Sequence, residues 1–345
     1  HNGLPWYEWE DSLLDPTPKE RASWMKLLAS EIDYYRFIQF AFFSQWYELK
    51  DYANKKGIAI IGDIPIFTAP DSADVWANKE LFKLDSKGYP LEVAGVPPDY
   101  FSATGQLWGN PLYDWDAMKD DGYRWWIERV RNQLDQVDYI RIDHFRGFEG
   151  YYAIPGGAAT ARDGVWRQGP GIELFHAVRA ALGDLPIIAE DLGFLTEGVH
   201  RLREECGFPG MKVLQFAFDS REDSDYLPHN YPRHCVVYTG THDNDTIMGW
   251  MHTASPEDVR FAWEYLRLTE AEGPNWGMMC GALQSPGDTV ILTMQDLLGL
   301  GSEARMNIPS TLGCNWKWRA APDSITPELA DRLHHVTGLY RRLPR

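Results

Sequence analysis

Residues 139–144, with the sequence YIRIDH, form a short and largely apolar run that ends in charged groups. Runs of this kind are typical of parallel strands that are covered on both faces. Outward from it along the chain lie five more such runs: residues 58–67 (IAIIGDIPIF), 186–192 (PIIAEDL), 212–218 (KVLQFAF), 235–242 (CVVYTGTH) and 289–296 (TVILTMQD). The sequence therefore predicts six strands.

Helical patterns separate these strands. Gly57 and Gly207 stand just after two of them, where a helix commonly ends. Strands that alternate with helices indicate a parallel α/β fold. No GxGxxG motif follows a strand, which argues against a dinucleotide-binding sheet. The predicted helices cover residues 18–56, 122–136, 172–182, 196–206, 256–271 and 327–342.

Four of the predicted strands end with a carboxylate: Asp63, Asp143, Glu190 and Asp243. Side chains from the ends of so many strands meet at one point only if the sheet closes, as it does in (β/α)8 barrels. We therefore expect an α/β fold built as a (β/α)8 TIM barrel, with inserted loops and helical subdomains, over residues 1–345. Because a barrel of this type needs two more strands, the first barrel strands are expected in a segment before His1.

A segment rich in aromatic residues follows the first predicted strand. Within it, residues 95–115 (GVPPDYFSATGQLWGNPLYDW) read as a long loop without regular structure, and such loops are uncommon unless they are functional. We expect residues 68–115 to form an inserted lid that binds substrate, with Asp99 and Gln106 as polar anchors. The alternative is a rigid connector that packs on the rim of the barrel.

The charge balance limits the possible partners. The chain has 345 residues, with 33 Lys and Arg against 50 Asp and Glu, so its formal net charge is −17. A protein that binds nucleic acid or an anionic membrane needs a cationic surface, so neither partner is expected. No apolar run approaches the roughly 18 residues of a membrane-spanning helix. The four cysteines are widely spaced, as free thiols of a reducing compartment are. The expected location is the cytoplasm, with a plastid stroma as the alternative.

Strand alternation places Arg141 and Asp143 on the same side of their strand, with Ile142 facing the helices. A guanidinium beside a carboxylate lowers the pKa of that carboxylate. Asp143 should therefore stay ionised at neutral pH, as a nucleophile must. The alternative is a buried ion pair with a purely structural role.

Glu190 follows four apolar residues and should lie in a drier place than Asp143. Burial raises the pKa of a carboxyl group and lets it carry a proton at neutral pH. Asp191 points to the opposite face, where it would only hold a helix. Two carboxylates of unlike pKa are the parts that glycoside chemistry requires, one to attack the anomeric carbon and one to protonate the leaving oxygen.

Residues 241–245 (THDND) form a third polar cluster. His242 and Asp243 have the groups to bind the hydroxyls of a ligand. A metal site is the alternative, but there is no HxH pair, and zinc needs three or four well-placed ligands. Neither a metal nor a cofactor is expected.

At these residues the chain resembles the 4-α-glucanotransferases, the amylomaltases or disproportionating enzymes of the α-amylase clan. The resemblance is carried by GDIPIF, GVPPDYFSATGQLWGNPLY, RIDHFRGFEGY, AEDLG, GMKVLQFAF, YTGTHDND and QDLLGLGSEARMN, in family order. It implies a retaining transfer of α-1,4-glucan segments to the 4-hydroxyl of an acceptor sugar through a covalent glycosyl-aspartate. It also implies Asp143 as nucleophile, Glu190 as general acid/base and Asp243 as transition-state stabiliser. Substrate contacts are implied for Asp63, Asp99, Gln106, Trp108, Arg141, His242 and Asn307.

The resemblance implies α-1,4-glucan donors and glucose or maltooligosaccharide acceptors as partners, and an N-terminal segment of the same protein that completes the barrel. Two other functions remain open: hydrolysis of α-glucans by the same three carboxylates, and glycan binding without catalysis. At one position the sequence departs from the family, since Cys314 stands where Gly is usual. A positive φ at Cys314 would cost about 1 kcal/mol.

Overall fold

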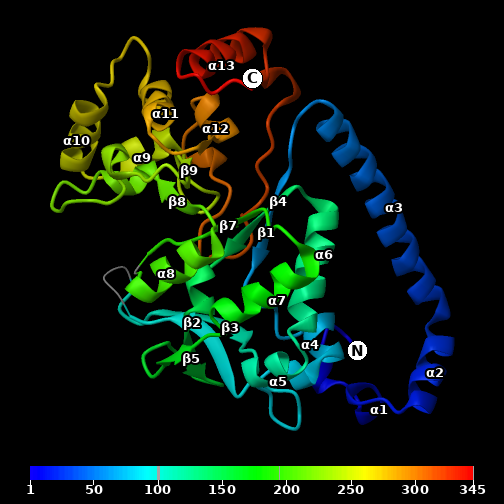
Figure 1. Cartoon of the computed structure of the whole chain (residues 1–345). Coiled ribbons are helices and arrows are strands. Elements are labelled where there is room, and N and C mark those ends of the chain that lie inside the picture. Colours follow the sequence, from blue (N-terminus) through cyan, green and yellow to red (C-terminus); the bar gives the residue numbers. More distant parts are fainter. Residues whose placement is uncertain (99–101, 194, 345) are drawn as a thin grey trace. The chain divides into compact units, whose positions relative to one another are not determined.

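The structure, a computed structural model, describes residues 1–98, 102–193 and 195–344. The chain divides into two compact units, His1–Phe208 and Pro209–Arg345, which Figure 1 shows in blue to green and in green to red. Within the described ranges, every helix is too short or too polar to serve as a membrane span.

The first unit contains a parallel sheet in the order β1-β4-β7, formed by Ile61–Pro65, Tyr139–Asp143 and Ile187–Ala189. This confirms the first three predicted strands and their parallel direction. Strand β1 pairs with β4 so that Asp63 lies opposite Arg141. The isoleucines next to Asp63 and Arg141 on these two strands are buried, and Ile142 is only 1% exposed. The register therefore brings polar groups from two strands together above a dry core.

Helices of the first unit follow the predicted pattern closely. Helix α7 spans Ile172–Leu182 as predicted, and α6 spans Arg124–Gln136. Helix α8, Glu197–Cys206, begins after Thr196, whose hydroxyl accepts a hydrogen bond from a backbone N–H of the first turn. It ends at Gly207, which has the left-handed backbone that stops a helix. The other helices of this unit are α1 (Asp11–Leu14), α2 (Pro18–Leu27), α3 (Ala29–Lys55), α4 (Ala73–Ala77) and α5 (Trp115–Asp120), with 3-10 turns η1 (Trp6–Glu8), η2 (Lys79–Leu81) and η3 (Phe145–Phe148).

A second sheet in the first unit was not predicted. It is antiparallel, in the order β3-β2-β5-β6, formed by Gln106–Pro111, Glu92–Val96, Gly150–Pro155 and Val165–Gln168. The prediction that residues 95–115 form a loop without regular structure was therefore wrong. These strands were not predicted because they are short, because β2, β3 and β5 contain Gly or Pro, and because β2 and β5 pair across about 60 residues of sequence.

Aromatic side chains make up much of the core of the first unit. Tyr113, Trp126, Phe145 and Phe148 are each at most 1% exposed and pack ring against ring. The Tyr113 hydroxyl donates to the carbonyl of Ile66 at 2.7 Å. Core packing thus accounts for a large share of the aromatic residues in the sequence.

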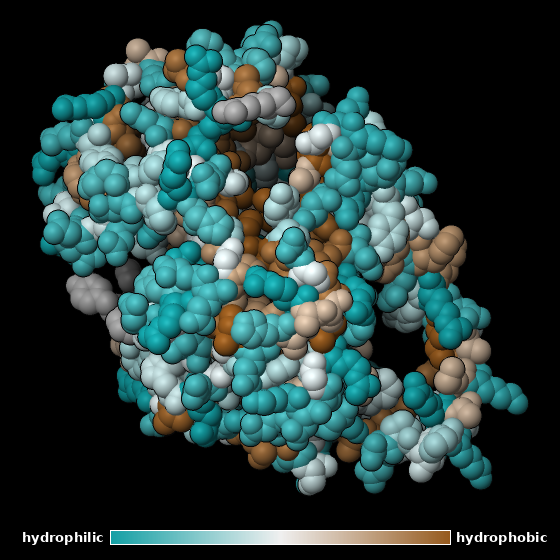
Figure 2. Space-filling model, viewed as in Figure 1, coloured by the Kyte–Doolittle hydropathy of each residue, from teal (hydrophilic) through white to brown (hydrophobic). Residues whose placement is uncertain are grey.

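Helix α3 is 27 residues long, and none of its residues is buried. Its C-terminal half touches the rest of the unit, where the Trp46 indole donates to the carbonyl of Gln136 at 2.8 Å. Further along its surface, Phe37 is 65% exposed and Phe40 is 70% exposed. Brown, hydrophobic side chains lie along this helix in Figure 2.

The second unit contains a parallel sheet in the order β10-β9-β8, formed by Thr289–Ile291, Cys235–Tyr238 and Gly210–Val213. All three strands were predicted, but the strand expected at residues 212–218 ends at Val213. The chain continues as a 3-10 turn, η4, Leu214–Ala217. The buried Gln215 in this turn donates to the backbone carbonyl of Asp245 at 2.8 Å. The turn thereby fixes the segment that follows β9.

Helices pack around this sheet. Helix α10, Pro256–Leu266, is shorter than predicted because Arg267 takes a left-handed conformation with φ 57°. Helix α11, Pro274–Gln284, was not predicted, although almost all of it is buried. The remaining elements are α9 (Ile247–Thr253), α12 (Met294–Leu297), α13 (Pro327–Leu339), η5 (Pro228–Asn230), η6 (Ser302–Ala304) and η7 (Pro322–Ser324).

Within the described residues the fold is thus α/β, with separate parallel and antiparallel sheets. Its six predicted parallel strands form two three-stranded sheets, and one further sheet is antiparallel. Closure of the parallel strands into one eight-stranded barrel is not shown by this pairing.

Candidate functional site

Arg141 on β4 links two carboxylates in the first unit. Its Nη1 donates to both oxygens of Asp63, at 2.8 and 2.7 Å, and its Nη2 lies 3.1 Å from Asp143 Oδ1. The prediction that Arg141 and Asp143 share one side of the strand is confirmed. The Arg141 side chain is 9% exposed, whereas those of Asp63 and Asp143 are 42% and 45% exposed. The guanidinium is therefore embedded, and the two carboxylates open to solvent.

The charge on Arg141 is secured by its neighbours. Burial alone lowers the pKa of this guanidinium, but the negative charges of Asp63 and Asp143 raise it by more, and the net shift is upward. Glu190 adds to the upward shift. A permanent positive charge thus stands beside Asp143.

Glu190 follows the last residue of β7 and is held by two backbone N–H groups. His144 N–H donates to its Oε2 at 2.7 Å, and Leu192 N–H donates to its Oε1 at 3.0 Å. Burial raises the pKa of Glu190 to about 7, and the charge of Asp143 acts in the same direction. Arg141 and the two N–H groups oppose this rise without cancelling it. A carboxyl group with this pKa carries a proton in about half of the molecules near neutral pH, and burial as the main cause agrees with the predicted dry environment.

Asp191, the next residue, faces the other way. Its Oδ2 lies 3.1 Å from Arg203 Nε on α8, and the residue is 8% exposed. This contact with α8 agrees with the expectation that Asp191 holds a helix.

His144 is a residue of this site that the sequence reasoning missed. Its backbone is left-handed, with φ 53°, and this conformation turns its N–H to Glu190. Burial, together with the charge of Arg146, lowers the pKa of the imidazole to about 4, so the ring is neutral at pH 7. The position of His144 directly after Asp143 in RIDHFRG was the available signal.

Two of the predicted lid residues lie on β3. The Trp108 indole donates to Gln106 Oε1 at 3.1 Å, and its ring meets the His144 ring edge-on, with centroids 4.8 Å apart and an interplanar angle of 88°. The structure thus joins Trp108 to the residue that holds Glu190. Asp99, the third predicted lid residue, lies outside the described residues.

The second unit brings together His242, Asp243 and Asn307. Asn307 Nδ2 donates to Asp243 Oδ1 at 2.6 Å, and its backbone N–H donates to the carbonyl of His242 at 3.0 Å. His242 Nε2 lies 3.5 Å from Asp243 Oδ2. The Asp243 carboxylate is thus fixed from two sides, while its side chain remains 42% exposed.

Arg305 holds this group of residues together and was also missed. Its Nη2 donates to the carbonyl of Asp243 at 2.6 Å, and its Nε donates to the carbonyl of Asn307 at 3.0 Å. The signal was its place in the motif EARMN. In the same loop Gly313 has a positive φ of 99° and Cys314 does not, so the strain considered for Cys314 does not arise.

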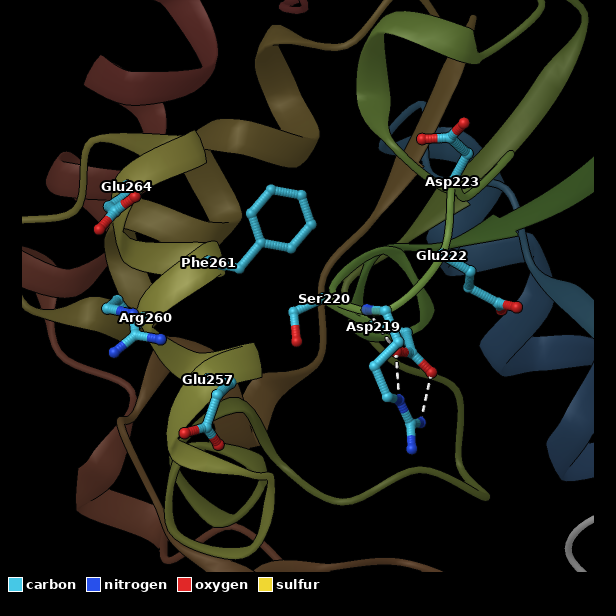
Figure 3. A pocket seen from close by; sticks show the side chains of 9 residues that line it. Asp219, Ser220, Glu222, Asp223, Glu257, Arg260, Phe261 and Glu264 are labelled. Carbon is cyan, nitrogen blue, oxygen red and sulfur yellow. Dashed lines mark hydrogen bonds and ion pairs between the residues drawn. The ribbon is translucent and has the colours of Figure 1, made fainter.

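An acidic cavity of about 490 Å³ also lies in the second unit. Figure 3 shows it beside α10, with the Phe261 ring projecting from the helix and Asp219 paired with Arg221. None of the predicted site residues lines it. Across the described ranges, no group of three or more His, Cys, Asp or Glu side chains is placed to hold a metal ion.

Comparison with known proteins gives a consistent result. The sequence profile of glycoside hydrolase family 77, described as 4-alpha-glucanotransferase, matches residues 1–325. The chain is 49% identical over 343 residues to a 4-alpha-glucanotransferase of Clostridium butyricum, covering 99% of this chain and 70% of the relative. It is 50% identical over 345 residues to a 4-alpha-glucanotransferase of Synechocystis, covering 99% and 68%. The structure of an amylomaltase from Streptococcus agalactiae in complex with acarbose superposes with a TM-score of 0.96 at 42% identity, covering 99% and 70%.

Proposed function

Since the chain belongs to the 4-alpha-glucanotransferase family, family 77 of the glycoside hydrolases, we propose that Asp143 and Glu190 are the reacting groups of its retaining transfer reaction. The observation that carries this assignment is the contrast between the two carboxyl groups. Asp143 lies against the Arg141 guanidinium and opens to solvent, whereas Glu190 has a pKa of about 7. One carboxyl is thus suited to attack, and the other to move a proton.

In the first half of the reaction, an oxygen of Asp143 attacks the anomeric carbon of the donor glucan. The bond from that carbon to the leaving oxygen breaks, and the proton of Glu190 passes to this oxygen. The products are a glycosyl ester on Asp143 and a shortened glucan with a free 4-hydroxyl. Arg141 stabilises the carboxylate before it attacks, and Asp63 fixes the orientation of Arg141 through its two hydrogen bonds.

In the second half, the 4-hydroxyl of an acceptor, glucose or a maltooligosaccharide, attacks the same carbon. Glu190 accepts the hydroxyl proton, and the ester bond to Asp143 breaks. Both residues return to their starting states. The α configuration is retained because two displacements occur in succession.

The remaining assignments follow the family resemblance. Asp243 is the transition-state stabiliser, and His242 and Asn307 contact substrate on the second unit. Gln106, Trp108 and Asp99 contact substrate from the lid at residues 68–115. The hydrogen bonds that fix the Asp243 carboxylate support a role that demands one orientation of this group.

Incubation with maltotriose tests the proposal against hydrolysis. Transfer produces glucose together with chains longer than maltotriose, whereas hydrolysis produces only shorter chains. Chain lengths are measured by mass spectrometry, with the variant Asp143→Asn as the inactive control. Shortening alone would replace transferase by α-glucan hydrolase, and no reaction would favour glycan binding without catalysis.

We also propose that residues 1–345 belong to a (β/α)8 barrel that is completed by a segment before His1. The support is the uncovered apolar surface of α3 and the end position of β1 in its sheet. Hydrogen exchange tests this: in a longer chain with the preceding segment, the N-terminal half of α3 should exchange more slowly. The wide spacing of the four cysteines in the sequence supports a reducing compartment, the cytoplasm or a plastid stroma.

A further inference from the structure

A cavity of about 270 Å³ in the second unit lies beside His242 but is not lined by Asp243. Its walls come from three segments: Thr241 and His242 after β9, Thr293 and Gln295 at α12, and Arg305 and Trp316 in the loop that follows η6. The cavity is slightly smaller than the range of about 300–1,000 Å³ typical of small-molecule sites. It therefore suits one ring-sized group.

The walls of this cavity are held in place by hydrogen bonds. The Thr241 hydroxyl donates to Asn244 Oδ1 at 2.9 Å, and Gln295 Nε2 donates to the carbonyl of Ala304 at 3.2 Å. Arg305 is fixed by its two bonds to backbone carbonyls. Hydroxyl, amide, imidazole and guanidinium groups thus surround a preformed space, as recognition of a polyhydroxylated ligand requires.

Trp316 supplies the apolar side of the cavity. Its side chain is 60% exposed, so it does not belong to the core of the unit. Its ring lies 5.1 Å from the His242 ring at an angle of 40°. The backbone of Trp316 is left-handed, with φ 60°, and its N–H donates to the carbonyl of Met306 at 2.7 Å. A bulky residue is strained in this conformation, and such strain gathers at ligand sites.

We propose that this cavity is a subsite for one glucose unit of an α-glucan, with Trp316 as the surface on which the sugar ring stacks. An indole offers a flat apolar face together with an N–H donor, and a pyranose ring offers a flat C–H face rimmed by hydroxyls. His242 lines this cavity and also contacts Asp243. A glucan bound in the cavity would therefore lie next to the residue that contacts the Asp243 carboxylate. The inference rests on the proposed function, since it names where part of the same substrate binds.

The test measures binding apart from turnover. Maltoheptaose is titrated calorimetrically into the full chain carrying Asp143→Asn, which cannot form the covalent intermediate. Adding Trp316→Ala should weaken binding roughly tenfold, and Trp316→Phe should weaken it less. The matched control is Trp166→Ala, at a tryptophan of the first unit that is 46% exposed, and it should leave the affinity unchanged.

Trp316→Leu is the control for a folding defect, because leucine keeps an apolar side chain but has no flat ring. Thermal unfolding is recorded for each variant, and Leu should weaken binding about as much as Ala with an unchanged unfolding temperature. Equal affinities for Trp316, Ala and Leu would overturn the subsite. If the parent Asp143→Asn chain itself fails to bind maltoheptaose, the proposed function fails and the subsite falls with it, which is a different result from loss in the Trp316 variants alone.

Discussion

The nucleophile assignment depends on contacts of a single residue. Asp143 has the Arg141 guanidinium 3.1 Å away and a side chain 45% exposed, so it is accessible and lies beside a positive charge. Replacing it by Asn keeps the shape and removes the attacking oxygen. We expect Asp143→Asn to lower kcat by several orders of magnitude while glucan affinity changes little. Transfer kinetics and calorimetric titration with maltoheptaose check both parts, and near-normal turnover would remove Asp143 from this role.

The acid role of Glu190 predicts a pH dependence. The pKa of this carboxyl is raised to about 7, chiefly by burial, and the first step needs its protonated form. The reaction kcat/KM should therefore fall as pH rises through about 7, because the proton donor is lost. Glu190→Gln should abolish this fall in kcat/KM with rising pH.

The same variant should respond differently to donors with different leaving groups. Glu190→Gln should slow transfer from maltooligosaccharides far more than transfer from a maltosyl donor with an activated aryl leaving group, which barely needs protonation. Initial rates for both donors are measured from pH 5 to 9. Equal losses on both donors would assign the proton transfer to another group.

Arg305 acts on Asp243 through the backbone. Without its two bonds to the carbonyls of Asp243 and Asn307, the Asn307 amide would no longer hold the carboxylate in one orientation. We expect Arg305→Met to lower kcat by roughly 10- to 100-fold with a smaller change in KM, since misplaced catalytic groups lose about this much. The exposed Arg260 on α10 provides the control Arg260→Met, which should behave as wild type.

A purely structural role for Arg305 makes a different prediction. In that case the unfolding temperature would drop, and Arg305→Lys would restore it. Under the positioning role, Lys fails because a single ammonium does not reproduce the two directed N–H donors of the guanidinium, and free guanidinium added to Arg305→Ala restores part of kcat.

At the residue scale, the sequence predicted side chains whose placement follows from strand alternation. Arg141 and Asp143 share a face for this reason, and Glu190 is dry because apolar residues precede it. His144 and Arg305 were missed because their roles depend on the backbone. A left-handed φ turns the N–H of His144 to Glu190, and Arg305 meets a carbonyl 62 residues away. Neither contact follows a sequence period.

At the scale of elements, pairing across long separations limited the predictions. The parallel strands were recognised from their apolar composition, and helix ends from Thr196 and Gly207. The antiparallel sheet was missed because β2 and β3 contain Gly or Pro, and because β2 pairs with β5, which is distant in the sequence. Residues 106–111 are therefore not part of a free loop: β3, with Gln106 and Trp108, is hydrogen-bonded to β2 of the first unit.

Gly95 is the residue that allows β2 to lie close to β3. A Cβ at this position would lie 2.1 Å from the carbonyl oxygen of Gln106 and 2.5 Å from Ile154 Cδ1. We expect Gly95→Ala to lower the free energy of unfolding by about 1–3 kcal/mol and to lower transfer activity, since β3 carries Gln106 and Trp108. Chemical denaturation measures the first effect and maltotriose disproportionation the second.

The same sheet provides a control for this prediction. A Cβ at Gly150 on β5 would meet only the carbonyl oxygen of Arg167, at an ordinary 3.4 Å. Gly150→Ala should therefore change the unfolding free energy by less than about 0.5 kcal/mol. If both variants were equally stable, the close approach at Gly95 would not determine the geometry of the sheet.

At the scale of the whole molecule, composition and element order predicted the α/β class but not the grouping of the strands. The six parallel strands divide three and three between sheets. The apolar pattern of a strand indicates that both of its faces are covered. It does not indicate which strand pairs with it. The division at residue 208 falls in a short stretch that contains Gly and Pro, residues 207–210 (GFPG), of which only Gly207 was recognised, as a helix end.

Helix α3 determines how the chain of 345 residues should behave in solution. Contiguous apolar patches of this kind are rarely left uncovered in monomeric proteins, and Phe37 and Phe40 are 65% and 70% exposed. We expect this chain to bind the dye ANS and to self-associate with rising concentration. The double variant Phe37→Ser with Phe40→Ser should reduce both, as measured by fluorescence and light scattering. Leu312→Ser removes an equally apolar residue that is 99% exposed in the second unit and should change neither, because an isolated apolar side chain does not form a patch. If dye binding is unchanged by the double variant, the exposed face of α3 is not the surface that binds the dye.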